Sequence, residues 1–241
     1  MTRKKLPKYP LVWQKDDFFI KIYCSIPNIS TGIILTTKNA SFVIDPGDGI
    51  LRDLNRDYTK DQILEISDIF ISHGHHDHLG GLWSLLTYLS VMKRTKTLNI
   101  YYPEGSPEIL SIHNAFTSVY GKEIDYKINL RGISNSKSFT KKSIKIKPFK
   151  VYHRELNDKD EAVEVPSLGF KYFYEGKSIC YGGDTAYCDN LVKMAKGSDL
   201  AVIEAGALTE DDADLHMTID QASEIGETAD EYFLVHVPDT I

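Results

Sequence analysis

The feature that most constrains this chain is a crowd of metal-binding side chains directly after a short apolar segment. Five such residues stand within six positions: His73, His75, His76, Asp77 and His78. The preceding segment, residues 68–72 with the sequence DIFIS, is typical of a buried strand, and the apolar residues after the cluster recur at helical spacing. The cluster therefore falls on a loop from a strand into a helix, a place that metal-binding and catalytic groups favour.

The spacing divides the cluster into two pairs of candidate ligands. His73 and His75 lie two residues apart, so both side chains can point to one side of an extended backbone. Asp77 and His78 follow where the chain bends toward the helix. Neutral imidazole and carboxylate groups are good zinc ligands, and two pairs predict two metal ions close together. Without a metal, the cluster would place several polar groups at the end of a buried strand without partners. The alternative, a solvated histidine-rich loop, is disfavoured because H-x-H-x-D-H after a buried strand is a highly specific pattern.

Residues further along the chain supply the ligands that one loop cannot. Three of them stand at the end of an apolar run that is typical of a strand: His153, Asp184 and His236. A lone histidine at a strand end is usually a structural residue. Beside a metal-binding loop, however, three such residues are better explained as further ligands, delivered by neighbouring strands to one rim.

The remaining sequence alternates between segments typical of strands and of helices. Periodicity and turn residues predict strands at residues 18–25, 31–37, 41–45, 68–72, 97–102, 126–130, 142–152, 168–174, 177–182, 199–205 and 231–237. Helices are predicted at residues 59–66, 82–92, 107–120, 187–196 and 218–229. Thr59 with Gln62, and Thr218 with Gln221, each fit a capping box at a helix start. This order favours two packed sheets with helices outside, within one domain over residues 1–241.

Composition places the chain among ordinary globular proteins and excludes several classes. Hydrophobic residues make up 42% and charged residues 26% of the 241 residues. The net charge of −6 does not predict non-specific binding to nucleic acid, and no apolar run is long enough to cross a membrane. Three cysteines without a CxxC motif, and a basic N-terminus without a signal peptide, favour a cytoplasmic protein.

The order of the candidate ligands, H-x-H-x-D-H and then a histidine, an aspartate and a final histidine, resembles the metallo-β-lactamase superfamily over nearly the whole chain. The resemblance implies a four-layer αββα sandwich with two zinc ions. The first ion would be held by His73, His75 and His153. The second would be held by Asp77, His78 and His236, with Asp184 bridging the two ions. Asp45 matches an earlier motif of the superfamily, and we expect its carboxylate to accept the other N–H of a ligating histidine.

Details within the superfamily resemble ribonuclease Z and related phosphodiesterases. The segments SICYGGDT, VIEAG and HMTIDQASEIGETADEYFLVHV carry this resemblance. It implies that a hydroxide on the metals attacks phosphorus, that Asp77 positions or deprotonates this nucleophile, and that His216 protonates the leaving oxygen. Glu204 matches an acidic residue of a neighbouring motif and is expected to orient His216. Zinc is the expected metal, with manganese or iron as alternatives.

The sequence also departs from ribonuclease Z. Those enzymes carry a long tRNA-binding arm between the equivalents of His153 and Asp184, whereas here predicted strands fill much of a short interval. The remainder, residues 154–166 with the sequence RELNDKDEAVEVP, is acidic and is interpreted as a mobile loop at the rim that repels a phosphate backbone. The ending after His236 lacks the family's Ser-x-Arg-Tyr-like motif. A small nucleotide or a short nucleic acid is therefore the expected phosphodiester substrate, with tRNA 3′ processing as an alternative.

Alternatives of other classes stay open. The same two-zinc site can hydrolyse a lactone, an ester or a thioester, because a fold does not fix the chemistry. In that case a tyrosine such as Tyr187 would replace His216, although a place in the core is the simpler explanation for Tyr187. A metal-binding module without turnover is disfavoured, because it would not need seven ligands. A homodimer is also considered, with residues 97–103 and the following helix as its interface.

Overall fold

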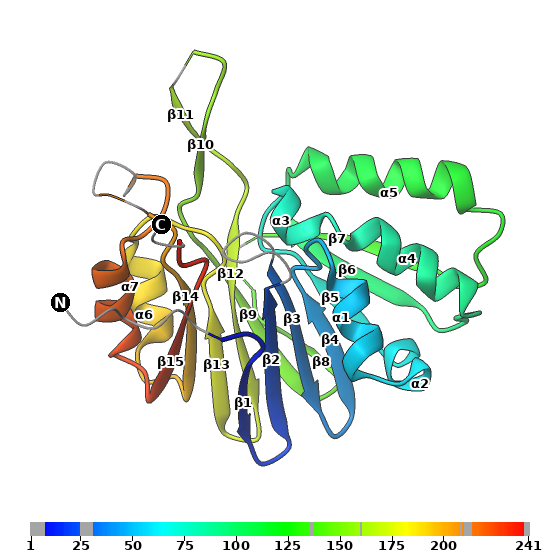
Figure 1. The fold of residues 1–241 in the computed structure, drawn as a ribbon, viewed down its shortest axis with the longest axis horizontal. Coiled ribbons are helices and arrows are strands. Elements are labelled where there is room, and N and C mark those ends of the chain that lie inside the picture. Colours follow the sequence, from blue (N-terminus) through cyan, green and yellow to red (C-terminus); the bar gives the residue numbers. More distant parts are fainter. Residues whose placement is uncertain are drawn as a thin grey trace.

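The computed structural model describes residues 8–24, 31–134, 137–159, 161–207, 209 and 214–238. Two β-sheets face each other at its centre, and helices cover the outer face of each sheet (Figure 1). The layers follow the order helix, sheet, sheet, helix. This architecture confirms the predicted αββα sandwich, which lets each sheet bury one face against its partner and the other against helices.

The first sheet contains seven strands in chain order. They are β1 (Leu11–Lys15), β2 (Phe18–Cys24), β3 (Thr31–Thr37), β4 (Ala40–Ile44), β5 (Asp68–Phe70), β6 (Leu98–Pro103) and β7 (Ile128–Ile133). Neighbouring strands from β1 to β4 are antiparallel, and those from β4 to β7 are parallel. The carboxyl ends of β4 and β5 consequently meet at one edge of the sheet.

The second sheet contains six strands in the order β15, β14, β13, β12, β9 and β8. They are β8 (Phe139–Lys141), β9 (Ile144–Lys150), β12 (Leu168–Tyr174), β13 (Lys177–Tyr181), β14 (Leu200–Glu204) and β15 (Glu231–Val235). Strands β13, β14 and β15 are parallel, so their carboxyl ends also share one edge.

The helices form the two outer layers (Figure 1). On the side of the first sheet lie α1 (Ile50–Asp57), α2 (Lys60–Leu64), α3 (His76–Leu79), α4 (Leu82–Val91) and α5 (Pro107–Tyr120). On the side of the second sheet lie α6 (Asp189–Ala195) and α7 (Ile219–Gly226). Both predicted capping boxes are confirmed, at the starts of α2 and α7.

Three apolar layers hold these elements together. One lies between the sheets, a second between the first sheet and its helices, and a third between the second sheet and α6 and α7. Strand β14 is buried along its whole length, because both of its faces are covered. Strand β9 instead alternates, with Ile144 and Ile146 buried and Lys145 and Lys147 exposed. Packing of these layers therefore fixes the strands whose carboxyl ends meet along one rim of the two sheets.

A separate hairpin projects from this rim (Figure 1). It consists of β10 (Arg154–Leu156) and β11 (Ala162–Glu164), which pair in antiparallel register. The sequence analysis interpreted this segment as a loop, and the structure contains a short ladder instead. The two strands are three residues long and largely exposed, so they show no apolar periodicity. Asp160, near the hairpin tip, lies outside the described residues.

Other differences concern elements without a clear sequence signal. Strands β1 and β8 and helices α1 and α3 were not predicted, whereas the remaining elements, apart from the hairpin, were found with ends shifted by a few residues. Strand β6, one part of the proposed dimer interface, is buried and paired with β5 and β7 on both sides, whereas the helix after it, α5, lies in the outer layer (Figure 1), and the homodimer stays a prediction. Within the described part of the chain, no helix is both long and apolar enough to span a membrane.

Candidate metal and active site

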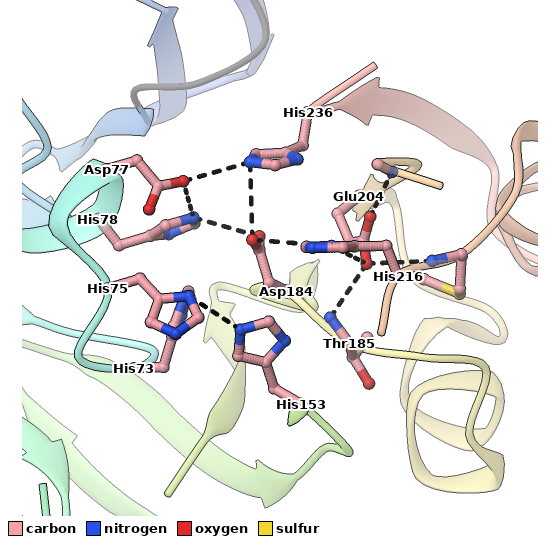
Figure 2. Close-up of polar contacts among 12 residues, drawn as sticks. His73, His75, Asp77, His78, His153, Asp184, Thr185, Glu204, His216 and His236 are labelled. Atoms are coloured by element: carbon pink, nitrogen blue, oxygen red, sulfur yellow. Dashed lines mark hydrogen bonds and ion pairs between the residues drawn. The ribbon is translucent and has the colours of Figure 1, made fainter. Parts of the chain in front are cut away.

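The candidate site lies where the carboxyl ends of strands from both sheets meet. The loop after β5 carries His73, and the loops after β13 and β15 carry Asp184 and His236. These side chains converge, and His153 reaches them from the segment after β9 (Figure 2). Loops at strand ends are positioned by the rigid sheets behind them. The topology thus brings together residues that are far apart in the sequence.

His73, His75 and His153 form one compact group of donor atoms. One nitrogen of each ring lies within 4.8 Å of the others. Nδ1 of His75 is 3.1 Å from Nε2 of His153. The grouping is the one that the sequence analysis expected around a first metal ion.

Asp77, His78, Asp184 and His236 form a second compact group, again with donor atoms within 4.8 Å of one another. Nε2 of His236 is 3.2 Å from Oδ2 of Asp77. Nε2 of His78 is 3.2 Å from Oδ1 of Asp184. The structure therefore brings the expected ligands of a second ion together, with Asp184 among them.

The carboxylate of Asp184 acts electrostatically on both groups. It is 3% exposed. Its negative charge works to raise the pKa of His73 and of His153, but burial of each ring has the larger effect and lowers both pKa values. Burial alone would raise the pKa of Asp184, but the facing rings of His78 and His236 hold it well below its usual range. Asp184 is therefore charged, which is the form of a carboxylate that can bind a cation.

The first group has the chemistry of a site for a divalent cation. Nε2 of His73 is buried and has no hydrogen-bond partner among the described residues. Burial lowers the pKa of His73, and it lowers the pKa of His153 to about 4, so both rings are neutral at neutral pH. Neutral imidazole is the form that binds metal. A cation at this place would satisfy a nitrogen that otherwise costs free energy to bury.

A buried carboxylate beneath the site orients one histidine of each group. Oδ2 of Asp45 lies 2.9 Å from Nδ1 of His78. The hydroxyl of Ser72 donates to the same oxygen at 2.6 Å and lies 3.0 Å from Nδ1 of His73. Nδ1 of each ring is thus engaged, which leaves Nε2 of His73 and His78 facing the cluster. The contact from Asp45 was expected from the sequence, whereas the relay through Ser72 was not.

Tyr181 joins this network from the second sheet. Its buried hydroxyl donates to Oδ2 of Asp45 at 2.5 Å. Asp45 follows β4 of the first sheet, so the bond links the two sheets directly beneath the metal-binding loop. Tyr172, on the neighbouring strand β12, also buries its hydroxyl, but this hydroxyl has no hydrogen-bond partner in the described part of the chain.

We expect Tyr181→Phe to lower the free energy of unfolding of the metal-free protein by about 1–3 kcal/mol, because a buried carboxylate loses a donor. Tyr172→Phe is the matched control, since it removes an unpartnered hydroxyl. It is expected to leave the stability unchanged or to raise it, because a buried hydroxyl without a partner costs free energy in the folded protein. Urea unfolding followed by circular dichroism measures both variants. Equal losses in the two would contradict the role assigned to the bond with Asp45.

His216 lies beside both groups of donor atoms. The centroid of its ring is 5.3 Å from that of His236 and 5.5 Å from that of His153. Nδ1 of His216 is 3.3 Å from Oε1 of Glu204 (Figure 2). Burial works to lower the pKa of His216, but the carboxylates of Glu204 and Asp184 outweigh it and raise the pKa. The ring therefore favours its protonated form, which can donate a proton. The contact to Glu204 uses Nδ1, so Nε2 is not part of it.

Glu204, at the end of β14, is buried and holds the loops around it. Oε1 accepts the backbone N–H of Thr185 at 3.1 Å and that of Met217 at 3.2 Å. Oε2 accepts the backbone N–H of Gly206 at 2.6 Å. The carboxylate thereby ties the loop after β13 to the segment that carries His216. The expected contact between Glu204 and His216 is present, and their catalytic roles stay predictions.

His76, between the grouped ligands, is exposed and lies outside both groups of donor atoms. Two other residues near the site differ from the sequence interpretation. Tyr187 is 41% exposed, so its interpretation as a core residue was wrong. Glu155, treated only as part of an acidic loop, has Oε2 3.2 Å from Nε2 of His75. Nothing in the sequence singled out Ser72, Tyr181 or Glu155, because each contacts a residue that is distant in the sequence and such a contact leaves no local pattern.

Comparison with known proteins gives a consistent result. Residues 41–237 match a family model described as a β-lactamase superfamily domain. A ribonuclease Z from Methanothermobacter thermautotrophicus is 24% identical over 238 residues, covering 83% of this chain and 77% of that protein. The metallo-β-lactamase fold protein YhfI from Bacillus subtilis superposes with a TM-score of 0.72 at 19% identity, covering 91% of this chain and 84% of that one. The short form of human tRNase Z superposes with a TM-score of 0.68 at 23% identity, covering 86% and 85%.

Proposed function

The chain belongs to the β-lactamase superfamily and is a hydrolase with the metallo-β-lactamase fold, and on that premise we propose that it cleaves phosphodiester bonds at a site for two zinc ions. The observation that carries the proposal is His216, backed by Glu204, beside both groups of donor atoms. Cleaving an alkyl phosphodiester expels a poor leaving group that needs a proton. The relatives named ribonuclease Z support the same chemistry.

The two groups of donor atoms fit two ions. The first ion would be held by His73, His75 and His153. The second would be held by Asp77, His78 and His236, among whose donor atoms Asp184 lies. The resemblance to the superfamily implies that both ions would share Asp184, and the effect of its charge on His73 and His153 supports this. Divalent ions in such a site lower the pKa of water and stabilise negative charge on phosphoryl oxygens. Imidazole and carboxylate without thiolate suit zinc best, with manganese or iron as alternatives.

The protein side chains then have separate tasks. The carboxylate of Asp77, which is partly exposed, orients or deprotonates the attacking water. His216 donates a proton to the leaving oxygen, and Glu204 keeps the ring of His216 in position through Nδ1. Because Glu204 also binds three backbone N–H groups, it is held firmly in place itself.

The surroundings of the site favour a small substrate. The projecting hairpin carries four carboxylates among its described residues: Glu155, Asp158, Glu161 and Glu164. Glu164 is paired with Lys150, and the other three would repel the backbone of a long nucleic acid, whereas a single phosphodiester can reach the metals. We therefore assign a small nucleotide or a short oligonucleotide as substrate. Processing of tRNA 3′ ends is the second candidate, favoured by the relatives named ribonuclease Z.

The test is hydrolysis of a panel of substrates by zinc-loaded protein. We expect cleavage of bis(p-nitrophenyl) phosphate and of a dinucleotide, abolished by a chelator and restored by zinc. Aryl lactone and thioester substrates serve as the other arms of the panel. Turnover confined to the lactone or the thioester would refute the phosphodiesterase proposal, and precursor tRNA cleaved faster than the dinucleotide would favour the second candidate.

A further inference from the structure

The ring of His75 lies between two partners, one at each ring nitrogen. Nδ1 faces Nε2 of His153 at 3.1 Å, and Nε2 faces Oε2 of Glu155 at 3.2 Å (Figure 2 shows the first of these contacts). A neutral imidazole has one donor nitrogen and one acceptor nitrogen. A carboxylate only accepts, so Nε2 of His75 carries the proton and Nδ1 presents its lone pair to the cluster.

We propose that Glu155 of the projecting hairpin is a positioning residue that makes His75 bind metal through Nδ1. The inference rests on the proposed metal centre and is independent of the substrate. Two other histidines of the same loop are held in a similar way, each by a partner at the nitrogen that does not face the cluster. Ser72 holds Nδ1 of His73 and Asp45 holds Nδ1 of His78, so these two rings face the cluster through Nε2.

The backbone explains how an otherwise exposed hairpin reaches this ring. His153 and Glu155 are two residues apart at the start of β10, so an extended chain directs both side chains to one side. The backbone N–H of Val165 donates to the carbonyl of His153 at 3.0 Å and closes the base of the hairpin. The hairpin is therefore anchored at a candidate ligand, and Glu155 is held against His75.

Exposure to solvent limits how much Glu155 can change the metal affinity. The side chain of Glu155 is 49% exposed and that of His75 is 35% exposed, so water competes for the same groups. Partners of metal ligands typically change metal affinity by about 10–100-fold. We expect the lower end of this range for Glu155, because the buried partners Ser72 and Asp45 are better shielded.

The experiment compares Glu155→Ala and Glu155→Gln with the wild-type protein. Glu161→Gln is the matched control, because Glu161 lies on the same hairpin and contacts Asn157 rather than a histidine. Zinc affinity is measured by competition with a chromophoric chelator. Nitrogen-15 NMR of the metal-free protein reports which nitrogen of His75 carries the proton.

We expect Glu155→Ala to weaken one of two zinc sites about 10-fold and to leave the other unchanged. Glu155→Gln should recover most of the affinity, since its amide oxygen still accepts the N–H, and Glu161→Gln should behave as wild type. In the metal-free wild-type protein the proton should reside on Nε2 of His75, and Glu155→Ala should shift it toward Nδ1. Unchanged affinity and unchanged tautomer in Glu155→Ala would overturn the proposal.

Neither readout involves turnover, so a wrong substrate assignment would leave this result intact. Failure of the metal centre itself would appear in the wild-type titration as an absence of zinc binding, and it would overturn both proposals. Equal weakening of both zinc sites together with a lower melting temperature would also overturn the inference, because it would mark Glu155 as a general structural residue.

Discussion

Asp184→Asn is expected to reduce phosphodiester turnover by more than about 100-fold. Changing a group that only contacts a metal ligand already costs about 10–100-fold in metal affinity or activity, and Asp184 is placed as a ligand itself. Its carboxylate lies 3.2 Å from Nε2 of His78 and 3.7 Å from Nε2 of His236. An amide has nearly the same shape but carries no charge, so the loss isolates the electrostatic contribution.

The measurement is the rate of bis(p-nitrophenyl) phosphate hydrolysis at saturating zinc, with metal content determined on the same samples. Asp189→Asn is the control, because Asp189 is an exposed residue at the start of α6. It should retain full turnover and full zinc content. Near wild-type rates in Asp184→Asn, with circular dichroism confirming the fold, would show that the two groups of donor atoms do not act through this carboxylate.

The loss of turnover in His216→Ala is expected to depend on the leaving group of the substrate. General acids contribute about 10²–10⁴-fold where the departing oxygen needs a proton. The alkoxide released from a dinucleotide needs one, whereas p-nitrophenolate is stable as an anion. We therefore expect a loss of about 10²–10⁴-fold on the dinucleotide and of less than about 10-fold on bis(p-nitrophenyl) phosphate.

The comparison of the two substrates within one variant excludes a general loss of structure or metal, which would slow both equally. His76→Ala serves as the control, since His76 is exposed and outside both groups of donor atoms. Glu204→Gln should show the same leaving-group dependence as His216→Ala, in weaker form, because His216 loses the charge that orients it. An equal loss on both substrates would remove His216 from the role of proton donor.

The sequence was most informative where all residues of a feature lie within one short segment. The order of His73, His75, Asp77 and His78 predicted a cluster of candidate ligands at a strand end, and the structure places these side chains there, while their binding of metal stays a prediction. The order of predicted strands and helices favoured two packed sheets with helices outside, and the resemblance to the metallo-β-lactamase superfamily implied the αββα layers that the structure contains. Capping boxes marked the starts of α2 and α7 for a similar reason: the signal lies within four residues.

The sequence was least informative where a contact joins distant parts of the chain. The bond from Tyr181 to Asp45 crosses between the sheets, and its residues carry no pattern that separates Tyr181 from the unpartnered Tyr172. The hairpin of β10 and β11 escaped prediction because its strands are short and polar, and Glu155 became visible only through its contact with His75. Such partners depend on tertiary packing, which local propensity does not encode.

The central claim is that two metal ions share one carboxylate at this rim. Anomalous diffraction from zinc-loaded crystals, recorded on both sides of the zinc absorption edge, tests it most directly. We predict two peaks, one at about 2.0–2.1 Å from nitrogen atoms of His73, His75 and His153, and one at similar distances from the second group. Oxygen atoms of Asp184 should contact both peaks. A single peak, or two peaks without Asp184 between them, would contradict the account.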